Sequence, residues 1–303
     1  MKESLMNLCL NILEILCIIF VIILLFVIII SFIENHIIKI TSYVIDDKRI
    51  PKAFDGFVIV HLTDLHNTTF GNDNEKLLEK VRNLSPDIIV VTGDMLVGRK
   101  NANVTIAANV LNELTKIAPT YFSMGNHELR ISRYLDTYGN MWDSFLKQLL
   151  PEVNLLFDKK AVVSRKDSHI NLFGVTLNTK LYTRLKDIRM PKKHLSKRFG
   201  TCNDEEYNIF LAHNPEYFKD YAAWGANLTF AGHVHGGIVR IPFLGGVISP
   251  KLKLFPEYDK GLFEHSNKYM VLSGGLGNHT FKIRINNLPE IVKVTLRHSD
   301  KTD

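Results

Sequence analysis

Short clusters of aspartate, asparagine and histidine recur between residues 64 and 235. They occur in "DLH" (64–66), "GD" (93–94), "GNHE" (125–128), "AHNP" (212–215) and "GHVHGG" (232–237). Carboxylate and amide oxygens, combined with imidazole nitrogens, suit first-row divalent ions such as Mn, Fe or Zn. A catalytic zinc ion typically takes three protein ligands, so the candidates are numerous enough for two ions that share one carboxylate. These candidate ligands are Asp64, His66, Asp94, Asn126, His213, His233 and His235.

Two of the clusters contain a pair of candidates separated by one residue, Asp64 with His66 and His233 with His235. If each pair continues a strand, the period of two directs both side chains of the pair to the same side. The glycines beside the second pair leave room for a ligand and permit a sharp turn. Each cluster taken singly is more often a turn, a capping loop or a structural histidine, whereas the five together indicate a metal site.

Strands and helices that alternate along the chain must position these clusters. Apolar runs at 57–66, 88–95 and 119–128 predict strands that end in polar loops, and the segments 74–87 and 103–117 have helical spacing. This order predicts parallel strands joined by helical crossovers. Ligands of such sheets bind beyond the carboxyl ends of the strands, where each polar cluster is expected.

The pattern changes after a helical segment around residues 134–150. Two strands that we expect to be antiparallel follow, with a turn near 166–168. The number of predicted strands is larger than a single sheet usually contains. We therefore expect two stacked sheets flanked by helices. The remaining predicted strands lie in 207–215, 226–237, 268–278 and 289–297.

The N-terminal part is strongly apolar. Residues 15–33 form a run of nineteen residues without a charge, which is enough to cross a bilayer as one helix. No small-residue cleavage site follows, as it would in a signal peptide. We therefore expect a single-pass membrane anchor and linker at 1–45 and one large α/β domain at 46–303. Counting only Lys and Arg favours the C-terminal side of the run as cytoplasmic by a slight margin, so the side of the catalytic domain stays open.

The composition excludes some classes of protein. Of the three cysteines, Cys9 and Cys17 lie in the apolar N-terminus, so Cys202 alone cannot build a disulfide framework or a cysteine-rich zinc site. The net charge of +6 suits an anionic partner and is equally ordinary for a soluble surface. Basic stretches with interleaved aromatic residues, typical of proteins that bind single-stranded nucleic acid, are lacking, so no specific nucleic-acid partner is expected.

The five clusters, in this order, resemble the calcineurin-like metallophosphoesterase superfamily over residues 55–297. The stretches "AGHVHGGIVRIP", "LFPEYDKGLFE", "GGLGN" and "RINNLPEI" are similar to its bacterial membrane-associated branch of YaeI- and YkuE-like phosphodiesterases. The resemblance implies an α/β fold, a four-layer α/β/β/α sandwich of two mixed sheets. That architecture agrees with the number of strands predicted above.

The resemblance also implies a role for each candidate. It implies two divalent ions (Mn, Fe or Zn), one held by Asp64, His66 and His235, the other by Asn126, His213 and His233, with Asp94 as the bridge. Two such ions lower the pKa of a bridging water, and the resulting hydroxide attacks phosphorus. His127 corresponds to the catalytic histidine of the family, which stabilises developing charge or protonates the leaving oxygen.

The motifs leave the roles of some neighbouring residues open. Glu128 is interpreted as a residue that orients a neighbour or forms an ordinary salt bridge, and Arg284 is expected at the surface rather than on a phosphate. Many relatives have an aspartate in a "GVDD"-like strand where this chain reads "GVTLNTK" (174–180). Any role of that aspartate is in doubt here, although every implied metal ligand is present.

The function expected from these observations is a membrane-anchored dinuclear-metal phosphoesterase, acting on a phosphodiester or a lipid-linked phosphate or pyrophosphate. The basic segment 179–198 either attracts an anionic membrane or substrate or is a solvated loop. The apolar segment 241–256 either forms a pocket wall for a lipid or aryl group or packs on the sheet. The alternatives are a phosphoprotein or phosphomonoester phosphatase and a catalytically silent membrane-tethered interaction module. The natural substrate, native metal pair and oligomeric state stay open.

Overall fold

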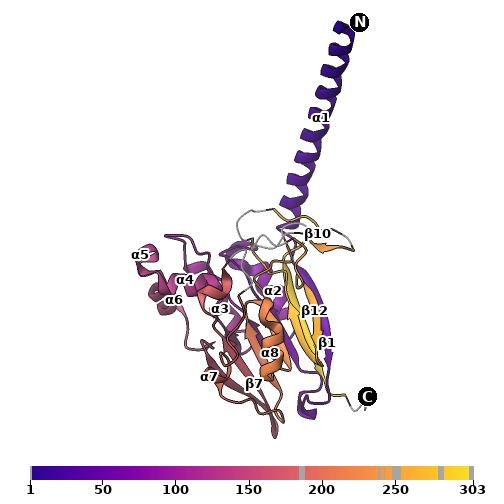
Figure 1. Cartoon of the computed structure of the whole chain (residues 1–303). Coiled ribbons are helices and arrows are strands. Elements are labelled where there is room, and N and C mark those ends of the chain that lie inside the picture. Colours follow the sequence, from indigo (N-terminus) through magenta and orange to yellow (C-terminus); the bar gives the residue numbers. More distant parts are fainter. Residues whose placement is uncertain are drawn as a thin grey trace.

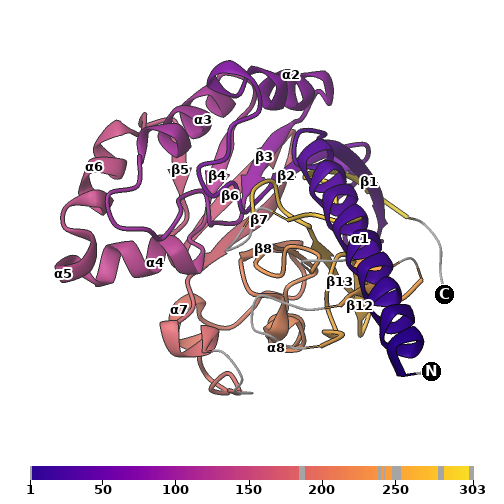
Figure 2. The same cartoon turned by 90° about the horizontal axis from the view of Figure 1, so that it is seen from above.

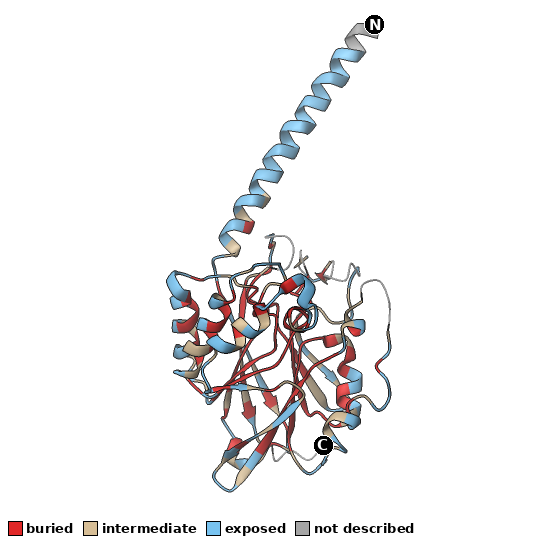
Figure 3. Cartoon of the chain, turned by 90° about the vertical axis from the view of Figure 1, so that its left-hand side faces the viewer, coloured by how far each residue is buried: buried red, intermediate tan, exposed pale blue. Residues whose placement is uncertain are grey.

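The structure is a computed structural model that describes residues 2–183, 188–237, 240–241, 243–247, 254–278 and 283–299, with side chains from residue 6 onward. Helix α1 (Lys2–Glu34) projects away from the rest of the chain (Figure 1). Most of its side chains are exposed (Figure 3). Among the described residues, its segment Met6–Glu34 is the one helix long and apolar enough to cross a membrane.

The first sheet combines a parallel centre with a C-terminal strand. Strands β2 to β5 run parallel, β14 is antiparallel to β2, and β1 is parallel to β14 at the edge. The boundary at residue 45 expected from the sequence therefore falls inside β1. In sheet order the strands are β1 (Lys39–Asp46), β14 (Glu290–Arg297), β2 (Val58–Leu62), β3 (Ile88–Val91), β4 (Thr120–Phe122) and β5 (Val153–Leu155).

The second sheet also has parallel central strands. Its two edge strands, β12 and β6, are antiparallel to their neighbours, and the antiparallel pair predicted around 166–168 is confirmed as β6 and β7. In sheet order the strands are β12 (Gly261–His265), β13 (Lys268–Leu272), β9 (Leu228–Ala231), β8 (Asn208–Ala212), β7 (Ser168–Val175) and β6 (Lys159–Arg165). A separate hairpin pairs β10 (Arg240–Ile241) with β11 (Gly245–Gly246).

Helices cover the outer faces of both sheets. Side chains of both sheets, among them Ile59, Val90, Leu172 and Phe230, form the buried core between them. The first sheet packs its other face on α2 (Glu75–Asn83), α3 (Thr105–Thr115) and α6 (Met141–Gln148), and the second on α7 (Ser196–Phe199) and α8 (Phe218–Trp224). Figure 2 shows the two groups of helices on opposite sides. The predicted α/β/β/α sandwich of two mixed sheets is confirmed.

Several elements end earlier than the sequence pattern predicts. β2 ends at Leu62 and β9 at Ala231, so the histidine-containing clusters after them lie in loops. The predicted loop after β4 is instead the start of α4 (Asn126–Arg133). The predicted helix around 134–150 is divided at Gly139, whose φ is 56°. Its parts are α5 (Leu135–Tyr138) and α6; the short 3-10 helices are η1 (Lys52–Phe54), η2 (Asn72–Asn74), η3 (Thr179–Tyr182) and η4 (Pro215–Tyr217).

Candidate dinuclear metal centre

The structure brings all seven predicted ligands and His127 together at the carboxyl ends of the central strands. Both sheets contribute, because the carboxyl ends of β2, β3, β4, β8 and β9 lie at the same side of the sandwich. Asp64 and His66 follow β2, Asp94 follows β3, Asn126 and His127 begin α4 after β4, His213 follows β8, and His233 and His235 follow β9. All eight are buried.

The backbone, rather than strand alternation, aims these side chains. The expectation that Asp64 with His66, and His233 with His235, share one strand face is wrong, because the strands have already ended. All four have positive φ, between 46° for His66 and 72° for His233, as does Asp94. A left-handed conformation costs a residue with a Cβ about 1–2 kcal/mol, and such strain is typical of functional sites.

Asp64, His66 and His235 form the first cluster, with one ligand atom of each within 4.8 Å of the others. The Nε2 atom of His235 lies 3.3 Å from Oδ1 of Asp64 and 3.2 Å from Nε2 of His66. Nδ1 of His235 faces the carbonyl oxygen of Gly277 at 3.2 Å. Because a carbonyl can only accept, Nδ1 carries the proton and Nε2 presents its lone pair to the cluster.

Asp94, His213 and His233 form the second cluster. Nε2 of His213 lies 3.1 Å from Oδ2 of Asp94, and Nδ1 of His213 donates to the carbonyl of Thr92 at 2.7 Å. The same Oδ2 of Asp94 lies 3.8 Å from Nε2 of His66. The carboxylate of Asp94 therefore lies between the two clusters.

Charge is concentrated in this buried site. Burial by itself raises the pKa of Asp94, but His213 and His127 outweigh burial and hold the pKa of this carboxyl well below its usual range. Burial disfavours the imidazolium of His213, yet the carboxylates of Asp94 and Asp64 raise the pKa of His213 to about 9. In the absence of metal, protons on the imidazoles thus neutralise the repulsion between carboxylates and ring nitrogens, which a divalent ion would otherwise neutralise.

The residues present fit divalent ions. Neutral His213 and His235 would direct Nε2 lone pairs at carboxylate oxygens, which is repulsive unless a proton or a cation lies between them. Oδ1 of Asn126 is buried and accepts no hydrogen bond from any described residue, and a cation satisfies such an oxygen. The donor set of two carboxylates, one amide oxygen and four imidazoles suits Mn, Fe or Zn.

His127 directs the proton on its Nε2 atom toward the two ligand clusters. Its Nδ1 accepts a hydrogen bond from the backbone N–H of Gly98 at 2.6 Å. Since that donor has no lone pair, the neutral ring must carry its proton on Nε2, which lies 3.8 Å from Oδ2 of Asp94. The backbone N–H of His127 donates to Oδ1 of Asp94 at 2.8 Å, so the same residue holds the carboxylate in place.

Glu128 stabilises the loops beneath the clusters. Of the two roles weighed from the sequence, the structure excludes a salt bridge among the described residues, because the carboxylate accepts only backbone N–H groups. They belong to Asp94 at 2.8 Å, Leu96 at 2.9 Å and Gly125 at 3.0 Å. Burial and the charge of Asp94 raise the pKa of Glu128 to about 7. The first turn of α4 is thereby joined to the loop of Asp94.

Two residues of the "RINN" stretch support the centre, and sequence reasoning missed both roles. Arg284, expected at the surface, is only 2% exposed; it donates to the carbonyls of Gly275 and Gly277 at 3.2 and 2.6 Å. The side-chain amide of Asn287 donates to the carbonyl of His235 at 2.6 Å. The contact of Asn287 with His235 joins residues 52 positions apart in the chain, and the burial of Arg284 depends on the folded loops around it, so no local pattern could reveal either role.

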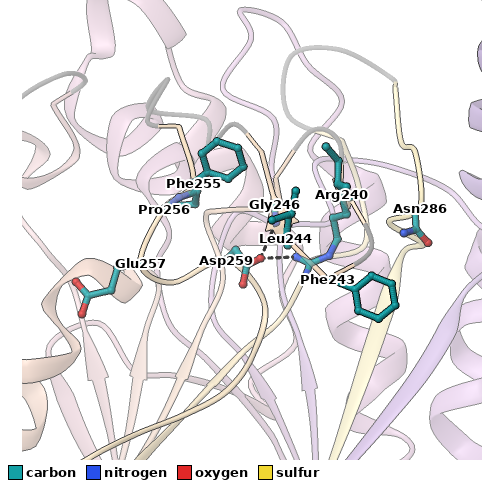
Figure 4. A pocket seen from close by; sticks show the side chains of 11 residues that line it. Arg240, Phe243, Leu244, Gly246, Phe255, Pro256, Glu257, Asp259 and Asn286 are labelled. Carbon is teal, nitrogen blue, oxygen red and sulfur yellow. Dashed lines mark hydrogen bonds and ion pairs between the residues drawn. The ribbon is translucent and has the colours of Figure 1, made fainter.

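Two segments singled out in the sequence also border the site. In the basic segment 179–198, of which 184–187 lie outside the described residues, the ring of Tyr182 packs edge-on against His233 with centroids 5.1 Å apart. The described parts of the apolar segment 241–256 line a pocket of about 520 Å³ (Figure 4); residues 242 and 248–253 lie outside the described chain. Arg240 and Asp259 form an ion pair of 3.0 Å in this pocket.

Known proteins resemble this chain over most of its length. The chain is 24% identical to the uncharacterized metallophosphoesterase YkuE of Bacillus subtilis, with 89% of each chain covered. It is 26% identical to the UDP-2,3-diacylglucosamine pyrophosphatase LpxG of Chlamydia muridarum, covering 86% of this chain and 90% of that protein. It is 24% identical to the phosphodiesterase YaeI of Escherichia coli, covering 79% of this chain and 82% of that one.

The family profile described as calcineurin-like phosphoesterase matches residues 57–237, more than half of the chain. This range begins at β2 and ends just after His235, so it includes every candidate ligand and His127. The chain belongs to the calcineurin-like phosphoesterase family and is a metal-dependent hydrolase.

Proposed function

We propose that this chain is a membrane-anchored phosphoesterase that hydrolyses a phosphodiester or a lipid-linked phosphate or pyrophosphate at two divalent ions. The observation that carries the proposal is the position of Asp94, whose carboxylate lies 3.1 Å from Nε2 of His213 and 3.8 Å from Nε2 of both His66 and His127. One carboxylate thus lies between two ligand clusters and beside a proton donor.

The ligand assignment follows the two clusters. Asp64, His66 and His235 would hold one ion; Asn126, His213 and His233 would hold the other; Asp94 would serve both, and the ions would be Mn, Fe or Zn. When bound, such a pair supplies a nucleophile from water near neutral pH and neutralises the phosphoryl oxygens. Backbone donors hold the two carboxylates in position, since the N–H of His233 donates to Asp64 at 3.0 Å and that of His127 donates to Asp94.

His127 is the proton donor of the proposed reaction. Because the N–H of Gly98 fixes its tautomer, the proton is always on the ring nitrogen that faces the clusters. Transfer of this proton to the leaving oxygen as the P–O bond breaks would avoid the release of an alkoxide. The nearby carboxylate of Asp94 then favours the return of a proton from solvent to Nε2 of His127.

The proposal of a lipid-linked substrate rests on two named relatives and on the apolar helix α1. LpxG is named as a pyrophosphatase of a diacylated sugar nucleotide and YaeI as a phosphodiesterase, and α1 of this chain is long and apolar enough to cross a membrane. A lipid-linked ester would diffuse within the same membrane as the enzyme. The full set of ligands argues against the catalytically silent module, and a phosphomonoester phosphatase is an outcome of the experiment below.

The experiment uses the full-length chain in detergent, stripped of metal with EDTA and resupplied with Mn²⁺. Turnover of bis(4-nitrophenyl) phosphate is compared with that of 4-nitrophenyl phosphate, and bound metal is counted by elemental analysis. Asp94→Asn should lose metal and about a hundredfold or more of the activity, whereas Asp136→Asn on the exposed surface of α5 should keep both. Preference for the monoester would favour a phosphatase, and two bound ions without turnover of either ester would overturn the phosphodiesterase proposal.

A further inference from the structure

Large exposed apolar side chains lie at the pocket beside the candidate metal centre: Phe243, Leu244 and Phe255 line it, and Leu254 directly precedes Phe255 in the chain. Phe243 is fully exposed, and Leu244, Leu254 and Phe255 expose 65, 66 and 57% of their surfaces. We call these four residues the apolar rim. In Figure 4 the rings of Phe243 and Phe255 lie on either side of the Arg240–Asp259 ion pair. Large apolar side chains exposed close together on a surface typically mark an interaction site.

The C-terminal end of α1 is bonded to the loop that lines this pocket. The carboxylate of Glu34 accepts the backbone N–H groups of Asn286 at 2.9 Å and Asn287 at 3.1 Å. The hydroxyl of Ser31 accepts the N–H of Arg284 at 3.0 Å. Asn286 itself lines the pocket. One loop, which contains Asn286, therefore both lines the pocket and is hydrogen-bonded to the end of α1.

If the uncharged run 15–33 spans the hydrocarbon core, its length sets the depth of the apolar rim. Residues 15–33 rise about 28 Å as a helix, which matches the roughly 30 Å hydrocarbon core of a bilayer. The next residue is Glu34, whose carboxylate binds the pocket loop. The headgroup layer begins where the hydrocarbon ends, so the face that carries the pocket lies against it. Figure 1 shows β10 beside the base of α1.

We propose that the apolar rim contacts the lipids of the membrane that α1 crosses, at the boundary between headgroups and acyl chains, so that the pocket opens into the bilayer surface. The inference rests on the membrane anchoring in the proposed function. The pocket adjoins the metal centre, since Arg240 donates to the carbonyl of Gly236, next to His235, at 2.9 Å. A lipid-linked ester could then enter without leaving the membrane.

The test measures the depth of single tryptophans in the full-length chain, reconstituted into phosphatidylcholine vesicles without bromine, with bromine high in the acyl chains, or with bromine near their ends, so that both shallow and deep tryptophans can be quenched. Phe243→Trp and Phe255→Trp report on the rim, and Phe26→Trp, exposed on α1, reports on the anchor. Asp167→Trp is the matched control, exposed in the β6–β7 turn at the opposite end of the second sheet. The signal of native Trp142 and Trp224 is subtracted using the unsubstituted chain.

We expect brominated lipid to quench Phe26→Trp and both rim tryptophans, but not Asp167→Trp. Rim tryptophans as unaffected as Asp167→Trp, in vesicles where Phe26→Trp is quenched, would overturn the inference and leave the anchor intact. An unquenched Phe26→Trp would instead overturn the anchor, and the proposed membrane function with it. Turnover of a soluble diester, measured on the same samples, reports separately on the catalytic part of the proposal.

Discussion

Arg284 donates a hydrogen bond from Nη2 to the carbonyl oxygen of Gly277 at 2.6 Å, and the same carbonyl faces Nδ1 of His235. Burial lowers the pKa of the guanidinium to about 10, so Arg284 stays charged at neutral pH. Its backbone N–H also binds Ser31 of α1. One buried arginine thus connects the end of the apolar helix with the loop that orients a candidate metal ligand.

Replacing Arg284 by methionine should lower the free energy of unfolding by about 2–5 kcal/mol, because several buried carbonyls lose their donor. Thermal unfolding of the full-length chain in detergent measures the effect. Arg297→Met is the matched control, since Arg297 forms a largely exposed ion pair with Asp46 and should cost at most about 1 kcal/mol. Equal melting temperatures of the two variants would contradict a structural role of Arg284.

His127→Gln should slow esters with poor leaving groups more than esters with good ones. A 4-nitrophenolate leaves without a proton, whereas an alkoxide needs the Nε2 proton of His127, so about 10²–10⁴ in kcat should be lost with an alkyl diester. Turnover of both esters and the metal content are measured together. The same loss with both leaving groups at unchanged metal content would contradict the role as proton donor.

Glu128→Gln should destabilise the loops beneath the clusters. The amide NH₂ group would face backbone N–H groups, so at least one of the three donors loses its acceptor, at a cost of about 1–3 kcal/mol. The resulting movement of the Asp94 loop should reduce activity about 10–100-fold. Glu113→Gln, in an exposed pair with Lys116, is the control. A Glu128→Gln variant as stable and active as Glu113→Gln would show that the carboxylate is dispensable.

The metal-free protein should become less stable as pH rises from 7 to 9. The folded-state pKa of His213 is about 9, above the unfolded value of about 6.5. Protonated His213 therefore contributes its full stabilisation below pH 6.5, and this contribution is lost as the pH rises through 9. Glu128, with a pKa of about 7, acts mainly below this window. Melting temperatures in EDTA should therefore fall from pH 7 to 9.

The His213→Gln variant provides the comparison for this pH series. Its melting temperature should depend less on pH, although His66, whose pKa is also raised by Asp64 against the effect of burial, retains part of the slope. Adding Mn²⁺ to the unsubstituted chain should reverse the trend, because the ion binds the deprotonated imidazole. Identical slopes for the variant and the unsubstituted chain in EDTA would contradict the raised pKa of His213.

The residue types that could bind metal, and the strand ends where they gather, can be predicted from the amino-acid sequence. Apolar runs that end in polar clusters predict that Asp64, Asp94 and His213 follow parallel strands, and the carboxyl ends of such strands meet at one edge. The number of predicted strands likewise indicated two stacked sheets. Both inferences depend on local periodicity, which a single sequence displays.

The directions of these side chains and the contacts that support them, in contrast, depend on long-range folding. The positive φ angles of His233 and His235 depend on contacts of their loop with Asp64 and Asn287, which no local pattern encodes. β1 was missed because its pairing partner, β14, is about 250 residues away. The buried position of Arg284 likewise exists only once α1, the 274–278 loop and the loops of the candidate ligands have come together, since hydrogen bonds between distant segments depend on the folded geometry of the whole chain.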